Sequence, residues 1–323
     1  MGWPSRLTAE VTEEVALDMT DHTSGGILAG LSGELADLVE RAGRSVVRVN
    51  ARRRQTASGI VFGADGAILT ADHVVEADEG ITVGLPDGRE VPARLVGRDP
   101  STDLAALRVE GASLIPAELA ESGSARVGSL VLAVARPGDS PMATIGVVSA
   151  RTGPWRSWRG GLLEALIQTD VTLYPGFSGG PLVDASGRVV GLNSSILTRG
   201  IATAIPTETL NRVAQALLTS GRVRRGYLGV STQPVTLPRA LVEQLKLGQE
   251  AGLLVVGVEP GSPADHGGLM LGDVIISLAG QPIRDADDLQ SALGPDLVGQ
   301  STPARVVRAG GSQELTITVG ERQ

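Results

Sequence analysis

Short apolar stretches separated by turn signals dominate the chain between residues 45 and 206. The intervals are short, and pairs such as Asp65-Gly66 and Asp87-Gly88 are typical of tight turns between strands. The predicted strands cover residues 45–49, 59–62, 67–70, 81–85, 104–109, 129–135, 144–150, 163–169, 181–183, 189–194 and 201–205. Such a series predicts an antiparallel β-barrel or β-sandwich.

Segments with helical spacing flank this β-rich region on both sides. Residues 1–30 are polar, acidic and rich in turn formers, which predicts a poorly ordered tail. The apolar positions of residues 35–39 then predict a short helix that ends near Gly43. On the other side, Thr207 is expected to cap a helix with one apolar face and an end at Gly221.

A second β-rich unit follows the charged run 222–225, which is expected to act as a linker. Its predicted strands cover residues 227–232, 252–258, 274–278 and 315–319, and its predicted helices cover 239–245 and 285–293. The sequence therefore predicts one domain over residues 31–220 and a second over residues 221–323, each long enough to have its own core.

Composition narrows the classes of function. The 28 basic and 36 acidic side chains give a formal charge of -8, which argues against a large basic surface for nucleic acid. The chain has no Cys, which excludes disulfides, thiolate zinc sites and a cysteine nucleophile. Its apolar runs are shorter than the roughly 18–20 residues of a membrane span, and its first residues lack the features of a signal peptide. The expected location is cytoplasmic for the chain as given, and extracytoplasmic if a targeting segment preceded it.

One of only three histidines stands in a setting suited to catalysis. His73 directly follows a predicted strand, Asp103 precedes an apolar strand, and Ser178 lies among glycines in the stretch 175–181. The order His, Asp, Ser along a β-rich chain matches the chymotrypsin-type triad, in which the aspartate orients the histidine and the histidine takes the serine proton. The amides of Gly176 and Ser178 are the candidates for an oxyanion hole.

Other chemistries fit the same residues less well. Residues 176–180 also satisfy the G-x-S-x-G pattern of α/β-hydrolases, but that fold needs its acid and histidine after the serine, where only His266 is available. The chain has neither a G-x-G dinucleotide fingerprint nor the Gly-Lys pair of a P-loop. The acidic stretch 285–288 has Gln290 where a calcium loop needs glycine. We therefore expect no cofactor and no metal.

Several segments together resemble the HtrA/Deg family of serine proteases. The trypsin-like core is matched by residues 58–62, 69–75, 102–107, 167–170, 175–182 and 204–206, and the PDZ domain that follows it by residues 225–230, 261–264 and 272–282. The resemblance implies a mainly β fold, a chymotrypsin-like double β-barrel protease domain followed by a PDZ domain. It implies an endopeptidase that cleaves misfolded or flexible proteins through His73, Asp103 and Ser178. The alternative is a catalytically silent or latent peptide-binding scaffold of the same fold.

The resemblance also implies binding sites for substrate and for peptide ends. The stretch 200–204 is expected to pair with the substrate backbone as an added strand. Thr172 stands where trypsin-type enzymes place the acid that selects Lys or Arg, so a preference for small or medium apolar residues is predicted. The expected substrate-binding residues are Thr172, Ile201, Ala202, Thr203 and Ala204, and those that receive a peptide C-terminus at the PDZ domain are Tyr227, Leu228, Gly229 and Val230.

Three further features bear on regulation and assembly. Phe177 stands where the family usually has Asn, a change expected to reshape the mouth of the site without removing either amide. The segment Arg151–Gly161, with Trp155 and Trp158, falls where the family has a variable regulatory loop that responds to a partner by ordering the oxyanion hole. Family members usually assemble through the N-terminal part of the protease, which implies a homotrimer.

Overall fold

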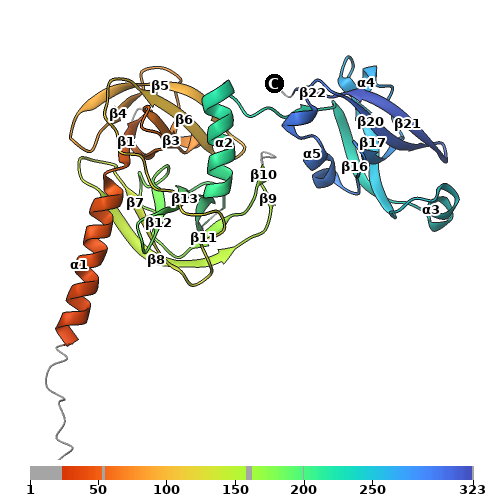
Figure 1. Ribbon diagram of the computed structural model, residues 1–323. Coiled ribbons are helices and arrows are strands. Elements are labelled where there is room, and N and C mark those ends of the chain that lie inside the picture. Colours follow the sequence, from red (N-terminus) through yellow and green to blue (C-terminus); the bar gives the residue numbers. More distant parts are fainter. Residues whose placement is uncertain (1–23, 53–54, 158–161, 199, 322–323) are drawn as a thin grey trace, which may run out of the picture.

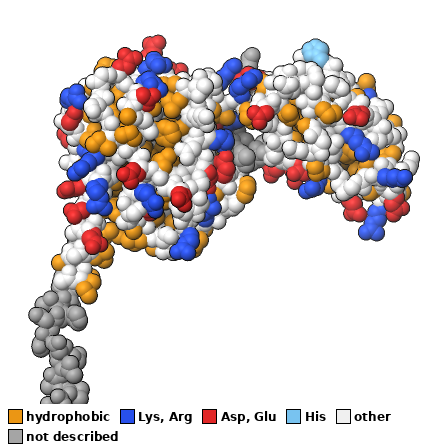
Figure 2. Space-filling view, in the orientation of Figure 1, with side chains coloured by type: hydrophobic (Ala, Val, Ile, Leu, Met, Phe, Trp, Pro, Cys, Tyr) orange, Lys and Arg blue, Asp and Glu red, His pale blue; other side chains and the backbone are white. Residues whose placement is uncertain are grey.

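The computed structural model describes residues 24–321 except 53–54, 158–161 and 199. Figure 1 shows two lobes joined by one connecting segment that follows helix α2 (Thr207–Ser220). Acidic and basic side chains lie interspersed over the face drawn in Figure 2, as the moderate net charge of -8 suggests. Among the described residues, the helices are too short or too polar to cross a membrane.

The first lobe begins with a closed antiparallel barrel in the order β1-β2-β3-β6-β5-β4. Its strands are β1 (Val46–Asn50), β2 (Ala57–Val61), β3 (Ala67–Thr70), β4 (Thr82–Gly84), β5 (Glu90–Asp99) and β6 (Leu104–Val109). Strands β2 and β3 are buried throughout, because each is a short run of apolar and small residues inside the barrel wall. Strand β5 was not predicted, since its polar side chains alternate with half-buried ones.

A second closed barrel completes this lobe, in the order β11-β14-β13-β12-β7-β8. Its strands are β7 (Leu130–Ala135), β8 (Met142–Arg151), β11 (Ile167–Thr169), β12 (Pro181–Asp184), β13 (Val189–Ser194) and β14 (Ala202–Pro206). The predicted strand 163–169 is interrupted: its start belongs to β10 (Leu162–Leu163), which pairs with β9 (Trp155–Arg156) outside the barrel. The two barrels confirm the prediction of a mainly β, double-barrel fold.

Two long helices accompany the barrels. Helix α1 (Ser24–Gly43) ends where predicted but begins before residue 30, so the last residues of the expected tail are helical; residues 1–23 lie outside the described part. The predicted capping role of Thr207 is wrong, because Pro206 is the N-cap of α2 and Thr207 is already in its first turn. Gly221 does end α2, in the left-handed conformation with φ 73°.

The second lobe is a small domain around a sheet in the order β16-β17-β18-β20-β21. Leucine, isoleucine and valine side chains of this sheet pack with helix α5 to form its own core. Its elements are β15 (Gly226–Tyr227), β16 (Val230–Thr236), α3 (Arg239–Leu245), β17 (Ala251–Val258), α4 (Pro263–His266), β18 (Val274–Leu278), β19 (Gln281–Pro282), α5 (Ala286–Ala292), η2 (Pro295–Leu297), β20 (Ser301–Arg308), β21 (Gly311–Thr318) and β22 (Gly320–Glu321).

Candidate active site

His73 lies in the short 3-10 turn η1 (Asp72–Val74), which directly follows β3. Arg98 clamps this turn by donating to Asp72 Oδ1 at 2.5 Å and to the Val75 carbonyl at 2.8 Å. Burial of Arg98 opposes its charge, but the hydrogen bond and the charge of Asp72 outweigh burial and raise the pKa of Arg98. Arg52 donates to the His73 carbonyl as well. The imidazole is therefore carried by a turn that two arginines hold from outside.

Asp103 orients this imidazole from a tight turn between β5 and β6. It is 1% exposed and adopts φ 58°, a left-handed conformation uncommon for a residue other than glycine. Its Oδ1 accepts from the His73 backbone N–H at 2.9 Å, both of its oxygens lie 2.9 Å from His73 Nδ1, and Ser194 Oγ donates to its Oδ2 at 2.5 Å. With Nδ1–H facing the carboxylate, Nε2 is left as the acceptor that a general base requires.

Ser178 joins this pair through another serine. It is 8% exposed, and its hydroxyl oxygen lies 3.0 Å from Ser195 Oγ, which in turn lies 3.5 Å from His73 Nε2. The structure therefore gathers the three predicted catalytic residues into one cluster. Within the described part of the chain, however, the hydrogen-bond partner of the Ser178 hydroxyl is Ser195 and not His73. Sequence reasoning missed Ser194 and Ser195, because a Ser-Ser pair at a strand end carries no chemical signal.

The backbone beside Ser178 has the features of an oxyanion hole. Gly176 has φ 91°, and a Cβ there would lie 2.5 Å from Pro137 Cβ, so the position requires glycine. The amides of Gly176 and Ser178 donate to no protein acceptor among the described residues. Two unpaired N–H groups next to a candidate nucleophile are what a developing oxyanion needs.

Phe177, between these two amides, is fully buried in the core of the second barrel. Its ring meets that of Tyr174 edge to face, with the centroids 5.9 Å apart. The expectation that Phe177 reshapes the mouth of the site is not met, because its side chain points into the barrel. Its packing instead fixes the loop that presents the amides.

The residues expected to bind substrate are divided between surface and interior. Thr172 and Ile201 are exposed, Ala202 is half-buried, and Thr203 and Ala204 are buried. Strand β14 pairs with β11 at residues 202–204 and with β13 at Thr203 and Ala204, so neither edge is free at these last two residues. The expected strand addition over 200–204 is therefore corrected at Thr203 and Ala204, which are already paired on both sides within the barrel.

The turn that precedes Asp103 receives contacts from two distant segments. Asp99 is 3% exposed and accepts from Ser101, Thr102 and the linker residue Arg225, whose guanidinium lies 2.6 Å from Asp99 Oδ1. Ser157, from the segment 151–161, donates to the Ser101 carbonyl. In that segment Trp155 is partly buried against a core cluster to which both barrels and α2 contribute, whereas Trp158 lies outside the described residues. The segment just before Asp103 is thus hydrogen-bonded both to the linker, through Arg225, and to the segment 151–161, through Ser157.

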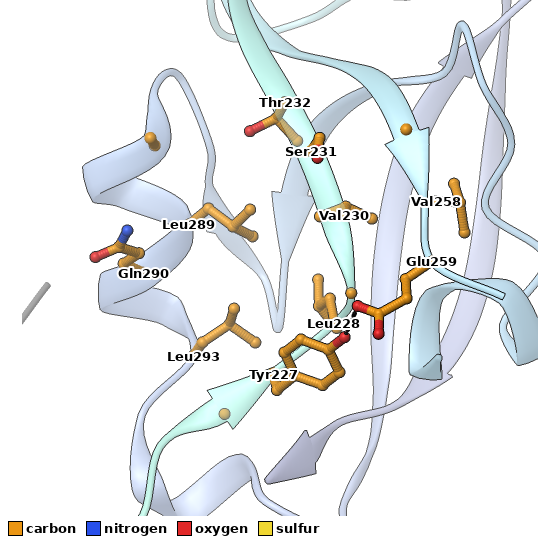
Figure 3. Close-up of a pocket in the computed structure, with 14 residues that line it drawn as sticks. Tyr227, Leu228, Val230, Ser231, Thr232, Val258, Glu259, Leu289, Gln290 and Leu293 are labelled. Carbon is orange, nitrogen blue, oxygen red and sulfur yellow. Dashed lines mark hydrogen bonds between the residues drawn. The ribbon is translucent and has the colours of Figure 1, made fainter. Parts of the chain in front are cut away.

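The second lobe has a groove of about 450 Å³ between β16 and α5. In Figure 3, Leu228, between β15 and β16, lies across the groove from Leu289 of α5 and from Leu293, the C-cap residue of that helix. The Tyr227 hydroxyl donates to Glu259 at one end of the groove. Among the described residues, the amides of Leu228 and Gly229 donate to no protein acceptor, and all four predicted residues, Tyr227 to Val230, line the groove.

Comparisons with known proteins agree with this architecture. Residues 57–192 match a trypsin-like peptidase domain and residues 254–296 match a PDZ domain. The chain is 42% identical over 278 residues to a probable periplasmic serine endoprotease, DegP-like, of Pseudomonas savastanoi, covering 83% of this chain and 57% of the relative. A protein of the same description from Ectopseudomonas mendocina is 40% identical over 91% of this chain and 63% of its own length. The chain thus spans about three fifths of these relatives.

Two solved structures resemble this chain over nearly the whole of their own length. The HtrA-type protease AlgW with a decapeptide matches with a TM-score of 0.75 and 33% identity, covering 89% of this chain and 98% of that one. A serine endoprotease from Yersinia pestis matches with a TM-score of 0.74 and 30% identity over the same shares. Both matches include the two barrels and the smaller domain, since each covers 89% of this chain.

Proposed function

The chain belongs to the HtrA-type family of serine proteases, and on this premise we propose that it is a serine endopeptidase that cleaves misfolded or flexible polypeptides. One observation carries the proposal: His73 Nδ1 faces the buried Asp103 carboxylate at 2.9 Å, in a cluster that includes the Ser178 hydroxyl and two unpaired amides. An oriented base, a nucleophile and an oxyanion hole are the three parts that acyl transfer requires.

In the proposed reaction Ser178 Oγ attacks the scissile carbonyl carbon while its proton passes to His73 Nε2. The carbonyl oxygen becomes an oxyanion that accepts from the amides of Gly176 and Ser178. The imidazolium, stabilised by Asp103, then gives its proton to the leaving nitrogen as the C–N bond breaks. Water then attacks the ester carbon while its proton passes to His73, and His73 returns this proton to Ser178 Oγ as the C–O bond breaks, which releases the second product and restores the free serine.

The test is digestion of unfolded β-casein by the wild type and by Ser178→Ala. Cleavage by the wild type alone supports the proposal, and kcat should fall by roughly 10⁴ to 10⁶ in the variant. Intact casein with both proteins, together with retained binding of C-terminal peptides, would instead favour a peptide-binding scaffold.

We assign the groove of the second lobe to peptide C-termini. The unpaired amides of Leu228 and Gly229 suit a terminal carboxylate, and the leucines that face them suit an apolar last side chain. Titration of a labelled peptide ending in valine, against the same peptide amidated at its C-terminus, tests this assignment. Binding of both with equal affinity would contradict it.

Thr172, Ala202 and Thr203 remain our proposal for the primary specificity pocket, and Ile201 remains our proposal for pairing with the substrate backbone. None of the three pocket side chains is acidic, so the proposed pocket has no partner for Lys or Arg and favours small or medium apolar residues. Cleavage mainly after Lys or Arg in a peptide-library profile would refute this assignment.

We further propose that the chain forms a homotrimer and acts outside the cytoplasm. Ile27 and Leu28 of α1 are 75% and 69% exposed, which supports assembly through the N-terminal part. The description of the relatives as periplasmic supports the location. Sedimentation of the full chain and N-terminal sequencing of the protein from cells test the two statements.

A further inference from the structure

The hydroxyl of Ser195 lies between the candidate nucleophile and the candidate base. Ser195 Oγ is 3.0 Å from Ser178 Oγ, a good distance for a hydrogen bond between hydroxyls, and 3.5 Å from His73 Nε2, at the limit of one. Ser195 follows the end of β13, in an exposed position. The contact to Ser178 is therefore the stronger of the two, and the contact to the imidazole is weak.

We propose that Ser195 is a positioning residue that holds the Ser178 hydroxyl in a resting hydrogen bond, away from His73. This inference rests on the proposed endopeptidase function. For attack, the Ser178 proton must pass to His73 Nε2. The Ser178 hydroxyl therefore has to break its hydrogen bond with Ser195 and form one with the imidazole before it can react. Ser195 therefore lowers the population of the reactive arrangement in the free enzyme.

Neighbouring contacts explain why Ser195 stands at this place. The Asn193 amide donates to the Gly180 carbonyl at 2.8 Å, and the Gly179 amide donates to the Asn193 carbonyl at 2.9 Å. This backbone pairing brings the end of β13 beside the loop that carries Ser178. Ser194, the residue before Ser195, donates to Asp103. The buried Ser194 thus contacts Asp103, and the exposed Ser195 that follows it contacts Ser178.

The experiment measures inactivation of the full chain by diisopropyl fluorophosphate, which reacts at the nucleophilic serine and needs no peptide site. Ser195→Ala should react about two to ten times faster than the wild type, where tenfold corresponds to about 1.4 kcal/mol for one hydrogen bond. The gain should be the same factor from about pH 6 to about pH 9, because Ser195 restrains the nucleophile and not the protonation of the base. Ser195→Thr, which keeps a hydroxyl, should lose most of the gain.

Ser124→Ala, at an exposed serine before β7, serves as the matched control and should react at the wild-type rate. A slower reaction of Ser195→Ala would overturn the inference in favour of a relay in which Ser195 passes the proton to His73. An unchanged rate would overturn it too. A wild type that does not react, alongside an unreactive Ser195→Ala, would refute the proposed function and this inference with it.

Discussion

Replacing Arg225 by alanine should lower kcat/KM for casein about tenfold without unfolding either lobe. Arg225 lies directly before the second lobe, yet its guanidinium donates to Asp99 and to the Ser101 hydroxyl in the first. Asp99 is buried at the end of β5, four residues before Asp103. Loss of Arg225 leaves this buried carboxylate without that cation and loosens the turn that orients His73.

The magnitude follows from the contacts. A hydrogen bond to a charged group contributes about 1.5–3 kcal/mol, and the lower end applies here because the Arg225 side chain is 31% exposed. Asp99 also keeps its donors from Ser101 and Thr102. If the full cost of about 1.5 kcal/mol is felt at Asp103, kcat/KM falls about tenfold, since 1.36 kcal/mol is one decade in rate.

A double-mutant cycle of Arg225→Ala and Asp99→Asn tests this reasoning. Both single variants should be slower than the wild type, and the double variant should be little worse than the slower single one, because the two side chains act through one contact. Arg224→Ala is the matched control, since Arg224 pairs instead with the half-buried Glu321 of β22 in the second lobe. Equal rates for Arg225→Ala and Arg224→Ala, or additive losses in the cycle, would refute the coupling.

Two further predictions concern the two lobes separately. Gly179→Ala should yield little folded protein, because Gly179 has φ 86° and a Cβ would lie 2.1 Å from the Ser58 carbonyl oxygen; a soluble, active variant would contradict this. Burial pushes the pKa of Asp273 upward, but hydrogen bonds from Arg308 and the Met270 amide outweigh burial and leave that pKa below its usual value. Asp273 therefore stabilises the lobe above its unfolded pKa of about 3.9, and this contribution is lost as the pH falls toward the folded pKa. Asp273→Asn should cost about 3 kcal/mol at neutral pH, and its deficit in urea unfolding should shrink below about pH 4; a constant deficit would disprove this role.

Apolar runs in the sequence predicted four of the strands to the residue. Strands β3, β6, β13 and β18 have the predicted bounds, because each is a short and largely apolar run in a barrel or sheet. Strands β5 and β20 were missed, since one face of each is exposed and carries charged or polar side chains. Exposed and buried positions alternate along most of β20. Such alternation is a signal for a strand, but a search for continuous apolar runs does not detect it.

The catalytic candidates were identifiable for a different reason. His73, Asp103 and Ser178 stand in flanking sequences that mark them as candidates, whereas Ser195 stands in none, and the PDZ-like segment that begins at Arg225 does not indicate a contact with Asp99. Their places in the site arise from tertiary pairing, Ser195 through the end of β13 and Arg225 through the path of the linker. No local pattern encodes such contacts, so only the folded structure reveals them.

The cluster of His73, Asp103 and Ser178 is held by hydrogen bonds that cross between the barrels. Ser194 of the second barrel donates to Asp103 of the first. In the other direction Ser58 of β2 donates its amide to the Ser178 carbonyl at 3.2 Å and its hydroxyl to the Gly176 carbonyl at 2.7 Å. Ser58 and Ser194 are fully buried, so water does not compete for these bonds. A shift of one barrel against the other would therefore disturb the proposed base, nucleophile and oxyanion hole together. A perturbation at the Asp103 turn can also reach Ser178 through Ser194 and its neighbour Ser195.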